Sequence, residues 1–322
     1  MPFRFASNRR LTTSGKCFPG ISGKFIKIFR PVDWFIAGYE FLMVLSALVF
    51  HHNISAYQVV ALRHTAALAA IIILRYLTVR FPGRILAIAS DWYPIATLPV
   101  TYHWAGDFIH AIFAWNLDGL LNQFDVWLIG DDPVRILQRG ASVRFTDLMQ
   151  LSYCSFFVMI FSSSLILYLK KLLRAFANLR LGIIAALYGT YLWFMLLPAH
   201  SPRFEVWRYL KLNGGWVTHQ ISAFISGTAY CGGAFPSGHA AGSLVICIFM
   251  VRYIKWWSLP FIITTVLLLL STLFGAYHYL VDILAGFIHG GFAILLAVWW
   301  NRTWDAKKQN AVECLNLKTI CK

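Results

Sequence analysis

Two residues in the last quarter of the chain have the spacing of a reactive histidine and its carboxylate partner. His278 and Asp282 are four residues apart, so in a helix their side chains would share one face. A carboxylate that accepts a hydrogen bond from Nδ1–H leaves Nε2 with an outward lone pair, as a nucleophilic or basic histidine requires. An aspartate in an apolar segment also needs a partner, because an isolated charge is costly there. We therefore predict that Asp282 orients His278.

A second candidate segment has the sequence Phe-Pro-Ser-Gly-His at 235–239. It follows a glycine-rich loop and opens an apolar stretch, and proline and serine are typical of helix starts. The free N–H groups and the dipole at the start of a helix favour bound anions. Ser237, Gly238 and His239 are therefore predicted to form a cradle for phosphate, in which Gly238 lets the main chain approach closely.

A third segment, Pro-Ala-His-Ser-Pro-Arg at 198–203, follows an apolar stretch and ends on Arg203. The guanidinium group of an arginine at the membrane surface can hold two phosphate oxygens at once. The alternative is that Arg203 only anchors the end of a helix by extending its charge toward water. We predict the phosphate-binding role.

The elements that must position these segments are membrane-spanning helices. Of the 322 residues, 59% are hydrophobic and 13% are charged, which is too apolar for a single soluble core. A crossing needs about 20 mostly apolar residues, and seven segments come close to this length. They lie at 33–51, 57–79, 149–170, 181–198, 239–254, 258–276 and 281–300. The predicted fold class is an all-α polytopic membrane protein.

The distribution of lysine and arginine predicts the topology. These residues gather before the first span, after the second, in the loop 170–180, at 252–255 and beyond residue 300. By the positive-inside rule all of these regions are cytoplasmic. Two cytoplasmic termini require an even number of crossings, so we predict a poorly hydrophobic eighth span at 95–114. The alternative is a re-entrant or interfacial segment. With eight spans, all three motif segments emerge on the extracytoplasmic side.

The chain is predicted to have four parts. A basic cytoplasmic arm covers 1–32, a pair of transmembrane helices covers 33–84, a helical bundle with the three motifs covers 85–300, and a basic cytoplasmic tail covers 301–322. The net charge of +15 does not predict a nucleic-acid partner, because the basic residues are spread along the chain and follow one side of the membrane.

Other polar residues are interpreted without a catalytic role. His103, Asp107 and His110 would share one face of the span at 95–114, and we interpret them as polar lining, with a metal site or a sugar-binding wall as the alternative. No spacing of cysteine and histidine matches a zinc site, so no metal is predicted. The aspartates of the following loop are interpreted as solvated turn residues: Asp118, Asp125, Asp131 and Asp132.

The Pro-Ser-Gly-His segment, followed by His-x-x-x-Asp, resembles the phosphatidic acid phosphatase type 2 superfamily of lipid phosphatases and phosphotransferases. The segment at 198–203 extends the likeness toward the inositol phosphorylceramide synthase branch. The resemblance implies that His278 attacks phosphorus, that His239 protonates the leaving oxygen and that Asp282 orients the nucleophile. It also implies a bundle of six helices, here with two extra N-terminal helices, and no cofactor. The phosphate ligands that it implies are Arg203, Ser237 and Gly238.

The sequence departs from the family pattern in its basic residues. The lysine that phosphatase members place well ahead of the first-motif arginine has no counterpart before Arg203. The arginine usually found six residues before the nucleophile is replaced by Thr272, and the position two residues before the nucleophile is Ala276. The candidate replacements are Arg63, Arg208 and Lys211.

The resemblance implies a membrane lipid phosphatase that hydrolyses a lipid phosphate monoester or pyrophosphate through a phosphohistidine. The alternative is a phosphotransferase of the inositol phosphorylceramide synthase type, which moves a phosphorylated headgroup to a lipid or polyol acceptor. An inactive lipid-phosphate-binding or transport protein is a third possibility. The expected partners are a lipid phosphate and the bilayer. The expected location is the plasma or inner membrane, with an extracytoplasmic active site.

Overall fold

The computed structural model describes residues 28–206, 212–228 and 231–320, and these residues form helices without a β-strand. Six stretches are long and apolar enough to cross a membrane, and one of them, Gly238–Phe274, comprises two helices joined by a short 3-10 turn at Lys255–Ser258. The predicted all-α membrane fold is confirmed. The long helices are α2 (Pro31–Val49), α3 (Tyr57–Arg80), α8 (Val143–Leu169), α9 (Leu173–Leu196), α12 (Gly238–Ile254), α13 (Leu259–Phe274) and α14 (Leu280–Ile320).

The poorly hydrophobic eighth span predicted at 95–114 is not a single helix, and it is not among the six described stretches that are long and apolar enough to cross a membrane. Residues 84–105 form two short helices, α4 (Arg84–Ala96) and α5 (Leu98–Ala105), and turns follow them. Neither helix alone is long enough to span a membrane. Pro94 and Pro99 explain the break, because each removes a backbone donor from the helix. The predicted span began at residue 95 because the prediction followed the apolar residues. The first of the two helices begins earlier, directly after Gly83.

Contacts at its two ends show that this segment traverses the bundle. Near its start, Asp91 accepts hydrogen bonds from Arg30, just before α2, and from Arg180, in the first half of α9. Beyond its end, the carbonyl oxygen of Ala111 accepts a hydrogen bond of 2.9 Å from the amide of Asn53, which lies between α2 and α3. The chain from Asp91 to Ala111 therefore covers the same length of the bundle as α2.

The outer surface of the long helices is apolar, as a lipid environment requires. On α14, Ile288, Phe292, Leu295 and Trp299 recur at helical spacing and are each more than 60% exposed. An exposed apolar stripe of this length is not stable against water. The chain is therefore built as a multi-pass membrane protein.

Helix α9 lies at the centre of the bundle and packs against α2, α5, α8, α12 and α14. Small residues allow close contact between these helices, as is typical of membrane proteins. A Cβ atom on Gly189 of α9 would lie 2.5 Å from the ring of His289 in α14. A Cβ atom on Gly290 would lie 2.7 Å from the carbonyl oxygen of Ala241 in α12. Close packing with α14 therefore fixes where α12 lies.

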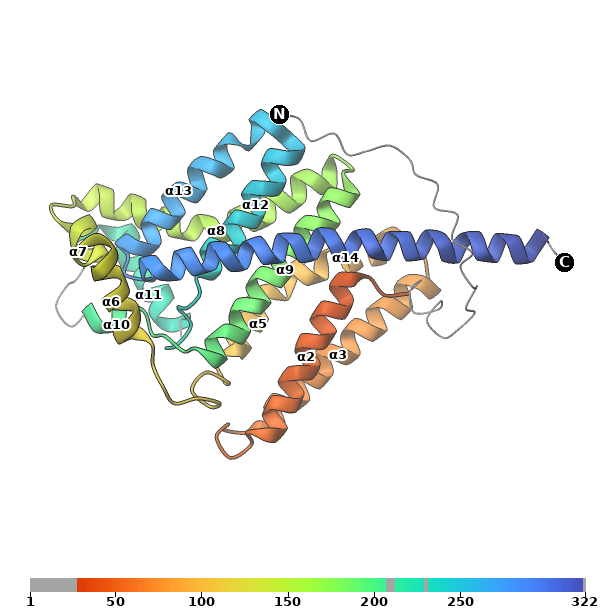
Figure 1. Ribbon diagram of the computed structural model, residues 1–322, viewed down its shortest axis with the longest axis horizontal. Helices are drawn as coiled ribbons and strands as arrows, with labels where there is room; N and C mark the ends of the chain where they lie inside the picture. The colour runs from red at the N-terminus through yellow and green to blue at the C-terminus, as the bar shows by residue number, and fades with distance from the viewer. Residues whose placement is uncertain (1–27, 207–211, 229–230, 321–322) are drawn as a thin grey trace.

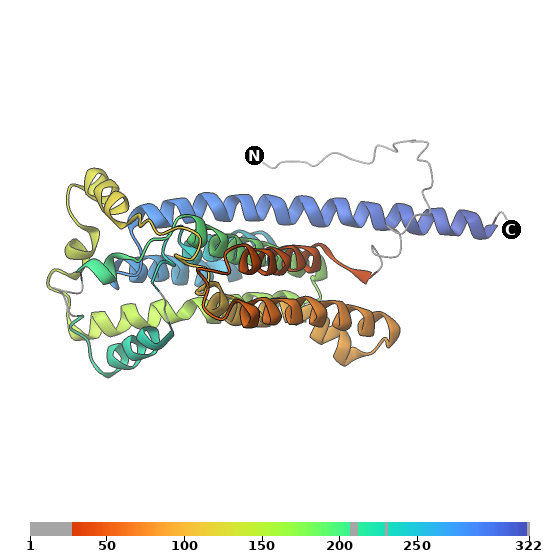
Figure 2. The ribbon, with the colours of Figure 1, turned by 90° about the horizontal axis from the view of Figure 1, so that it is seen from below.

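The two ends of the bundle differ (Figures 1 and 2). Four short helices gather at one end: α6 (Asp118–Ile129), α7 (Pro133–Gln138), α10 (Pro202–Val206) and α11 (Trp216–Thr228). At the other end the last part of α14 projects beyond the other helices. A helix of 41 residues is about 60 Å long, twice the thickness of the hydrocarbon layer. The start of α2 also lies at this second end, so both ends of the described chain are on the same side of the bundle.

Candidate active site

The two motif histidines meet at the end of the bundle that carries the short helices. His239 lies in the first turn of α12, and His278 lies in the turn between α13 and α14. The Nδ1 atom of His239 is 3.2 Å from the Nε2 atom of His278, and the ring centroids are 5.4 Å apart. The two nitrogen atoms are within hydrogen-bonding distance, so an anion that binds between the imidazoles must displace this contact.

His278 and Asp282 also meet, although not on one face of a helix. Helix α14 begins at Leu280, so His278 lies just before it. Asp282, in the first turn, turns back toward this segment, and its Oδ2 atom lies 3.3 Å from Nδ1 of His278 and accepts the backbone N–H of Tyr279 at 2.9 Å. The expected pair forms because the carboxylate also satisfies a free N–H group at the helix start.

This pairing suits the tautomer of His278 in which Nδ1 carries the proton. If Nδ1 donates its proton to Asp282, Nε2 carries a lone pair directed at His239. Burial lowers the pKa of His278 to about 4, and a hydrogen bond with the backbone of Ala234 opposes this shift. At neutral pH the imidazole is therefore uncharged, with its lone pair available.

Arg203 reaches the same site from α10. Its backbone N–H donates to the carbonyl oxygen of Ala276 at 2.8 Å, which ties the first motif to the loop that carries His278. Its Nη2 atom donates to the hydroxyl of Ser226 in α11 at 2.7 Å, and its guanidinium carbon lies 5.9 Å from the centre of the Tyr277 ring. Arg203, His239 and His278 line one cavity.

Ser237 and Gly238 take different positions at the start of α12. Gly238 lines the cavity and is the first residue of the helix, where backbone N–H groups have no partner within the helix. Ser237 is buried and is not among the lining residues, and its hydroxyl caps the helix by accepting the N–H of Ala240 at 3.3 Å. Its own N–H donates to the carbonyl oxygen of Asp282 at 3.0 Å. Ser237 therefore joins the second motif to the third.

The cavity beside the histidines has a volume of about 420 Å³ and a mostly apolar wall. Aromatic side chains of α5, α8 and α9 form much of this wall, which includes Tyr102, Tyr153, Phe156, Phe157, Tyr191 and Phe194. The polar lining beyond the histidine pair includes His103, His200 and Arg203. An apolar chamber with polar groups at one end suits an amphipathic molecule.

Two aspartates of α6 hold the motif loops together, and their interpretation as solvated turn residues was wrong. Asp118 and Asp125 are 3% and 2% exposed. Asp118 accepts the N–H groups of His200 at 2.8 Å and Ser201 at 3.0 Å. Asp125 accepts the first two N–H groups of α14, from Leu280 and Val281. Their seven-residue spacing puts both on one helical face, which is the signal that could have identified them.

The polar residues predicted for one face of the eighth span do not share one face. His103 lines the cavity, Asp107 pairs with Arg63, and the Nε2 atom of His110 lies 3.1 Å from Nε2 of His200. They separate because α5 ends at Ala105 and the chain then turns.

The structure also bears on two further predictions, namely which basic residues replace the missing motif cations and whether a metal ion binds. Arg63, a candidate replacement for the missing motif cations, is held by Asp107 and the carbonyl oxygen of Trp104 and is not among the cavity residues. The other two candidates, Arg208 and Lys211, lie outside the described residues. Within the described ranges no group of three or more histidine, cysteine, aspartate or glutamate side chains is arranged to hold a metal ion.

Comparisons with known proteins identify the family of the chain. A PA-phosphatase related-family protein of Dictyostelium discoideum is 29% identical over 114 residues, which cover 30% of this chain and 20% of that protein. The chain thus matches only a small part of that relative's length. No solved structure matches the chain. The model of the PAP2 superfamily matches residues 130–296, which include all three motif segments and just over half of the 322 residues. The chain belongs to the PAP2 superfamily, the phosphatidic acid phosphatase type 2 family that its motifs resemble, whose membership indicates phosphatase or phosphotransferase chemistry in a membrane.

Proposed function

We propose that this protein is a membrane lipid phosphatase that works through a phosphohistidine, with His278 as nucleophile and His239 as general acid. The observation that carries the proposal is the distance of 3.2 Å between Nδ1 of His239 and Nε2 of His278. The lone pair of His278 and the proton-carrying nitrogen of His239 face each other across the space that a phosphoryl group would enter. A phosphoryl group bound there replaces this direct contact.

The first half of the reaction transfers the phosphoryl group to the protein. Arg203 and the N–H groups at the start of α12, at Gly238 and His239, hold the non-bridging oxygens and offset the charge that builds on them. Nε2 of His278 forms a bond to phosphorus while the bond from phosphorus to the lipid oxygen breaks. His239 gives its proton to that oxygen, and Asp282 stabilises the positive charge that develops on His278.

The second half of the reaction regenerates the protein. His239, now without its proton, takes a proton from water while the water oxygen attacks phosphorus. The bond between phosphorus and Nε2 breaks, and inorganic phosphate leaves. We propose that Ser237 acts here mainly through its cap on α12 and its link to Asp282, which hold the N–H groups of the cradle in place.

The wall of the cavity supports a lipid as the substrate. A volume of about 420 Å³ lined largely by aromatic and aliphatic side chains can hold the part of an acyl or isoprenoid chain next to the phosphate. A water-soluble phosphate ester would gain nothing from this surface. We infer that the site acts on lipid phosphate monoesters or pyrophosphates at the extracytoplasmic membrane face, because the basic residues gather at the opposite end of the bundle.

A second candidate function is transfer of the phosphoryl or phosphorylated headgroup to an alcohol. The observation that favours it is the presence of His103 and His200 in the cavity wall. The imidazole of His103 can form a hydrogen bond with a hydroxyl group of a polyol or lipid acceptor. In this case the same phosphohistidine is attacked by an alcohol instead of water.

The experiment that tests the proposal uses the purified full-length chain with a panel of labelled lipid phosphates, with and without myo-inositol. We expect release of inorganic phosphate in both tubes and an acid-labile, base-stable label on the protein. The His278→Asn variant should lose both signals, whereas the His52→Asn variant, changed at an exposed histidine, should keep them. A labelled lipid that forms only with inositol would instead support the phosphotransferase. Turnover that survives in the folded His278→Asn variant would refute the mechanism.

A further inference from the structure

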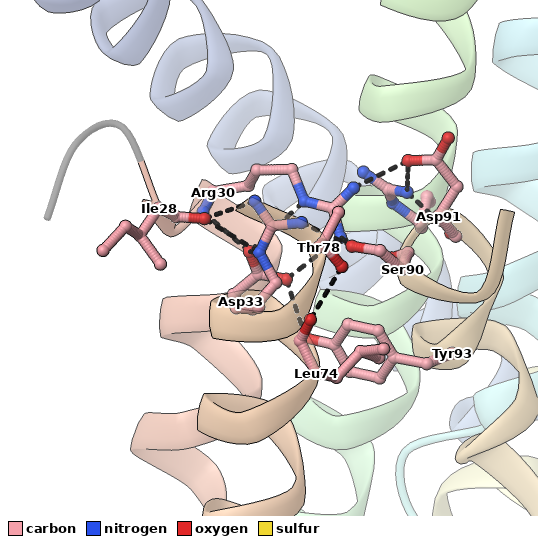
Figure 3. A network of polar contacts seen from close by, with 10 residues as sticks. Ile28, Arg30, Asp33, Leu74, Thr78, Ser90, Asp91 and Tyr93 are labelled. Atoms are coloured by element: carbon pink, nitrogen blue, oxygen red, sulfur yellow. Dashed lines mark hydrogen bonds and ion pairs between the residues drawn. The ribbon is translucent and has the colours of Figure 1, made fainter. Parts of the chain in front are cut away.

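A second polar site lies at the opposite end of the bundle from the histidines. Figure 3 shows this network of polar contacts from close by. Five charged residues from four parts of the chain meet there. Arg30 and Asp33 lie at the start of α2, Arg75 lies in α3, Asp91 lies in α4, and Arg180 lies in α9. The proposed reaction uses none of these residues.

The network contains more positive than negative charge. Asp33 pairs with Nε of Arg30 at 3.2 Å and with Nε of Arg75 at 3.1 Å. Asp91 pairs with Nη1 of Arg30 at 2.7 Å and with Nη1 of Arg180 at 3.3 Å. Three guanidinium groups therefore share two carboxylates, which leaves one positive charge without a counter-ion in this cluster.

Part of the network stabilises α4 where Pro94 interrupts its hydrogen bonds. Pro94 cannot donate a hydrogen bond to the residue four positions earlier, so it leaves the carbonyl oxygen of Ser90 without its helical partner. Arg30 donates to this oxygen, and both Arg30 and Arg75 donate to the hydroxyl of Ser90. These contacts explain two of the three arginines. They do not explain Arg180.

Within this cluster, Arg180 has a hydrogen-bond donor that is not used. Its side chain is 4% exposed, and Nη1 donates to the carbonyl oxygen of Asp91 at 2.6 Å. Its Nε–H group is buried and has no hydrogen-bond partner among the described residues. A buried charged donor without an acceptor is strongly unfavourable. An anion that reached it would satisfy the donor and neutralise the surplus charge.

Arg180 is one of the residues that line a cavity of about 380 Å³. Its charged lining is strongly basic, and its single lining carboxylate, Asp305, is paired with Arg174. The basic lining residues are Arg30, Arg75, Arg174, Arg180 and Lys308. The rest of the wall is largely apolar and includes Phe29, Leu173 and Trp304. The cavity thus combines cations with a surface suited to the interfacial region of a bilayer.

We propose that this cavity binds the phosphate group of an anionic phospholipid from the leaflet at this end of the bundle. Arginines hold phosphate oxygens well, and basic pockets between transmembrane helices recognise lipid headgroups. The walls come from α2, α3, α9 and α14, so a bound headgroup joins the N-terminal helix pair to the bundle that carries the histidines. The apolar part of the wall favours a lipid over free phosphate, because it can contact the glycerol and upper acyl carbons.

The experiment measures binding of dioleoyl phosphatidylglycerol to the full-length chain in a neutral detergent by native mass spectrometry. All variants carry Arg203→Gln, which weakens phosphate binding at the active-site cavity. Arg180→Gln should weaken binding of the lipid about tenfold or more, because it removes a charged donor from the phosphate. Arg302→Gln removes an exposed charge at the same end but outside the cavity, and should change the affinity less than about twofold.

A variant that is expected to bind the lipid more tightly controls for general damage to the fold. Asp91→Asn removes a negative charge from the network and should raise the affinity several-fold, whereas a merely unstable protein would bind less. Equal losses in Arg180→Gln and Arg302→Gln, or no loss in either, would overturn the proposal. Millimolar inorganic phosphate that displaces the lipid completely would overturn the assignment to a lipid in favour of a free anion. The outcome is independent of the phosphatase assay.

Discussion

The carboxylate of Asp118 accepts a hydrogen bond of 3.0 Å from the hydroxyl of Tyr279, 161 residues further along the chain. The same Oδ1 atom accepts the N–H of Ser201, so one side chain contacts the first motif and the residue next to His278. Asp125, seven residues later on α6, binds the start of α14. Helix α6 therefore clamps together two loops that the long helices only bring near each other.

The clamp predicts the effect of Asp118→Asn. An amide can replace only one of the two acceptor oxygens, so one of the contacts to His200, Ser201 or Tyr279 is lost. We expect kcat for lipid phosphate to fall about 10- to 100-fold through misplacement of the reacting groups, with little change in KM. Phosphate release from detergent-solubilised substrate measures this. Asp131→Asn is the matched control, because the side chain of Asp131 is 43% exposed and pairs with Arg135 at 3.8 Å, away from the motif loops. An equal loss in both variants would contradict the clamp.

The role of His239 as general acid predicts a dependence on the leaving group. His239→Asn keeps a polar side chain but cannot protonate the departing oxygen. With an alkyl lipid phosphate we expect a loss of about 10²- to 10⁴-fold in kcat/KM. With p-nitrophenyl phosphate, whose leaving group needs no proton, the loss should be far smaller. Losses of the same size with both substrates would show that His239 only binds phosphate.

The burial of His278 predicts the acidic limb of the pH profile. The nucleophile must be uncharged, and burial lowers its pKa from the ordinary 6.5 to about 4. The rate is therefore retained as pH falls from 7 toward 5 and is lost as pH falls through about 4, where His278 takes up a proton. The measurement is kcat/KM against pH, corrected for ionisation of the substrate. An acidic limb at 6.5 or above would mean that His278 titrates like a solvated histidine.

Two neighbouring glycines of α14 predict different effects on stability. Gly290→Ala would place a Cβ atom 2.7 Å from the backbone oxygen of Ala241, so α12 and α14 must separate. Overpacking of this kind costs about 1–3 kcal/mol, and the shift of α12 would also move His239. Gly291→Ala meets nothing within 4 Å and should be neutral or slightly stabilising. Thermal unfolding in detergent and phosphate release compare the two variants. A lower midpoint for Gly291→Ala than for Gly290→Ala would contradict the packing.

The arrangement around the reactive pair could be predicted only in part. The sequence indicated that His278, Asp282 and His239 belong to one site, because both motifs end up at the same face once the crossings are counted. It did not predict that His278 would lie outside α14, because the four-residue spacing fits a helix as well as it fits a turn capped by Asp282. It also missed Asp118 and Asp125, since an aspartate in a predicted loop looks the same in the sequence whether it is solvated or buried.

The amino-acid sequence by itself determined the class of fold, the approximate spans and the family motifs. Apolar length and local spacing encode these properties, and they depend only on residues close together along the chain. The tertiary structure decided the distance of 3.2 Å between His239 and His278, the clamp made by α6, and the surplus positive charge around Arg180. An apolar helix surface does not specify which neighbour it packs against. Contacts between distant residues form only when residues such as Gly290 and Ala241 fit together across two helices.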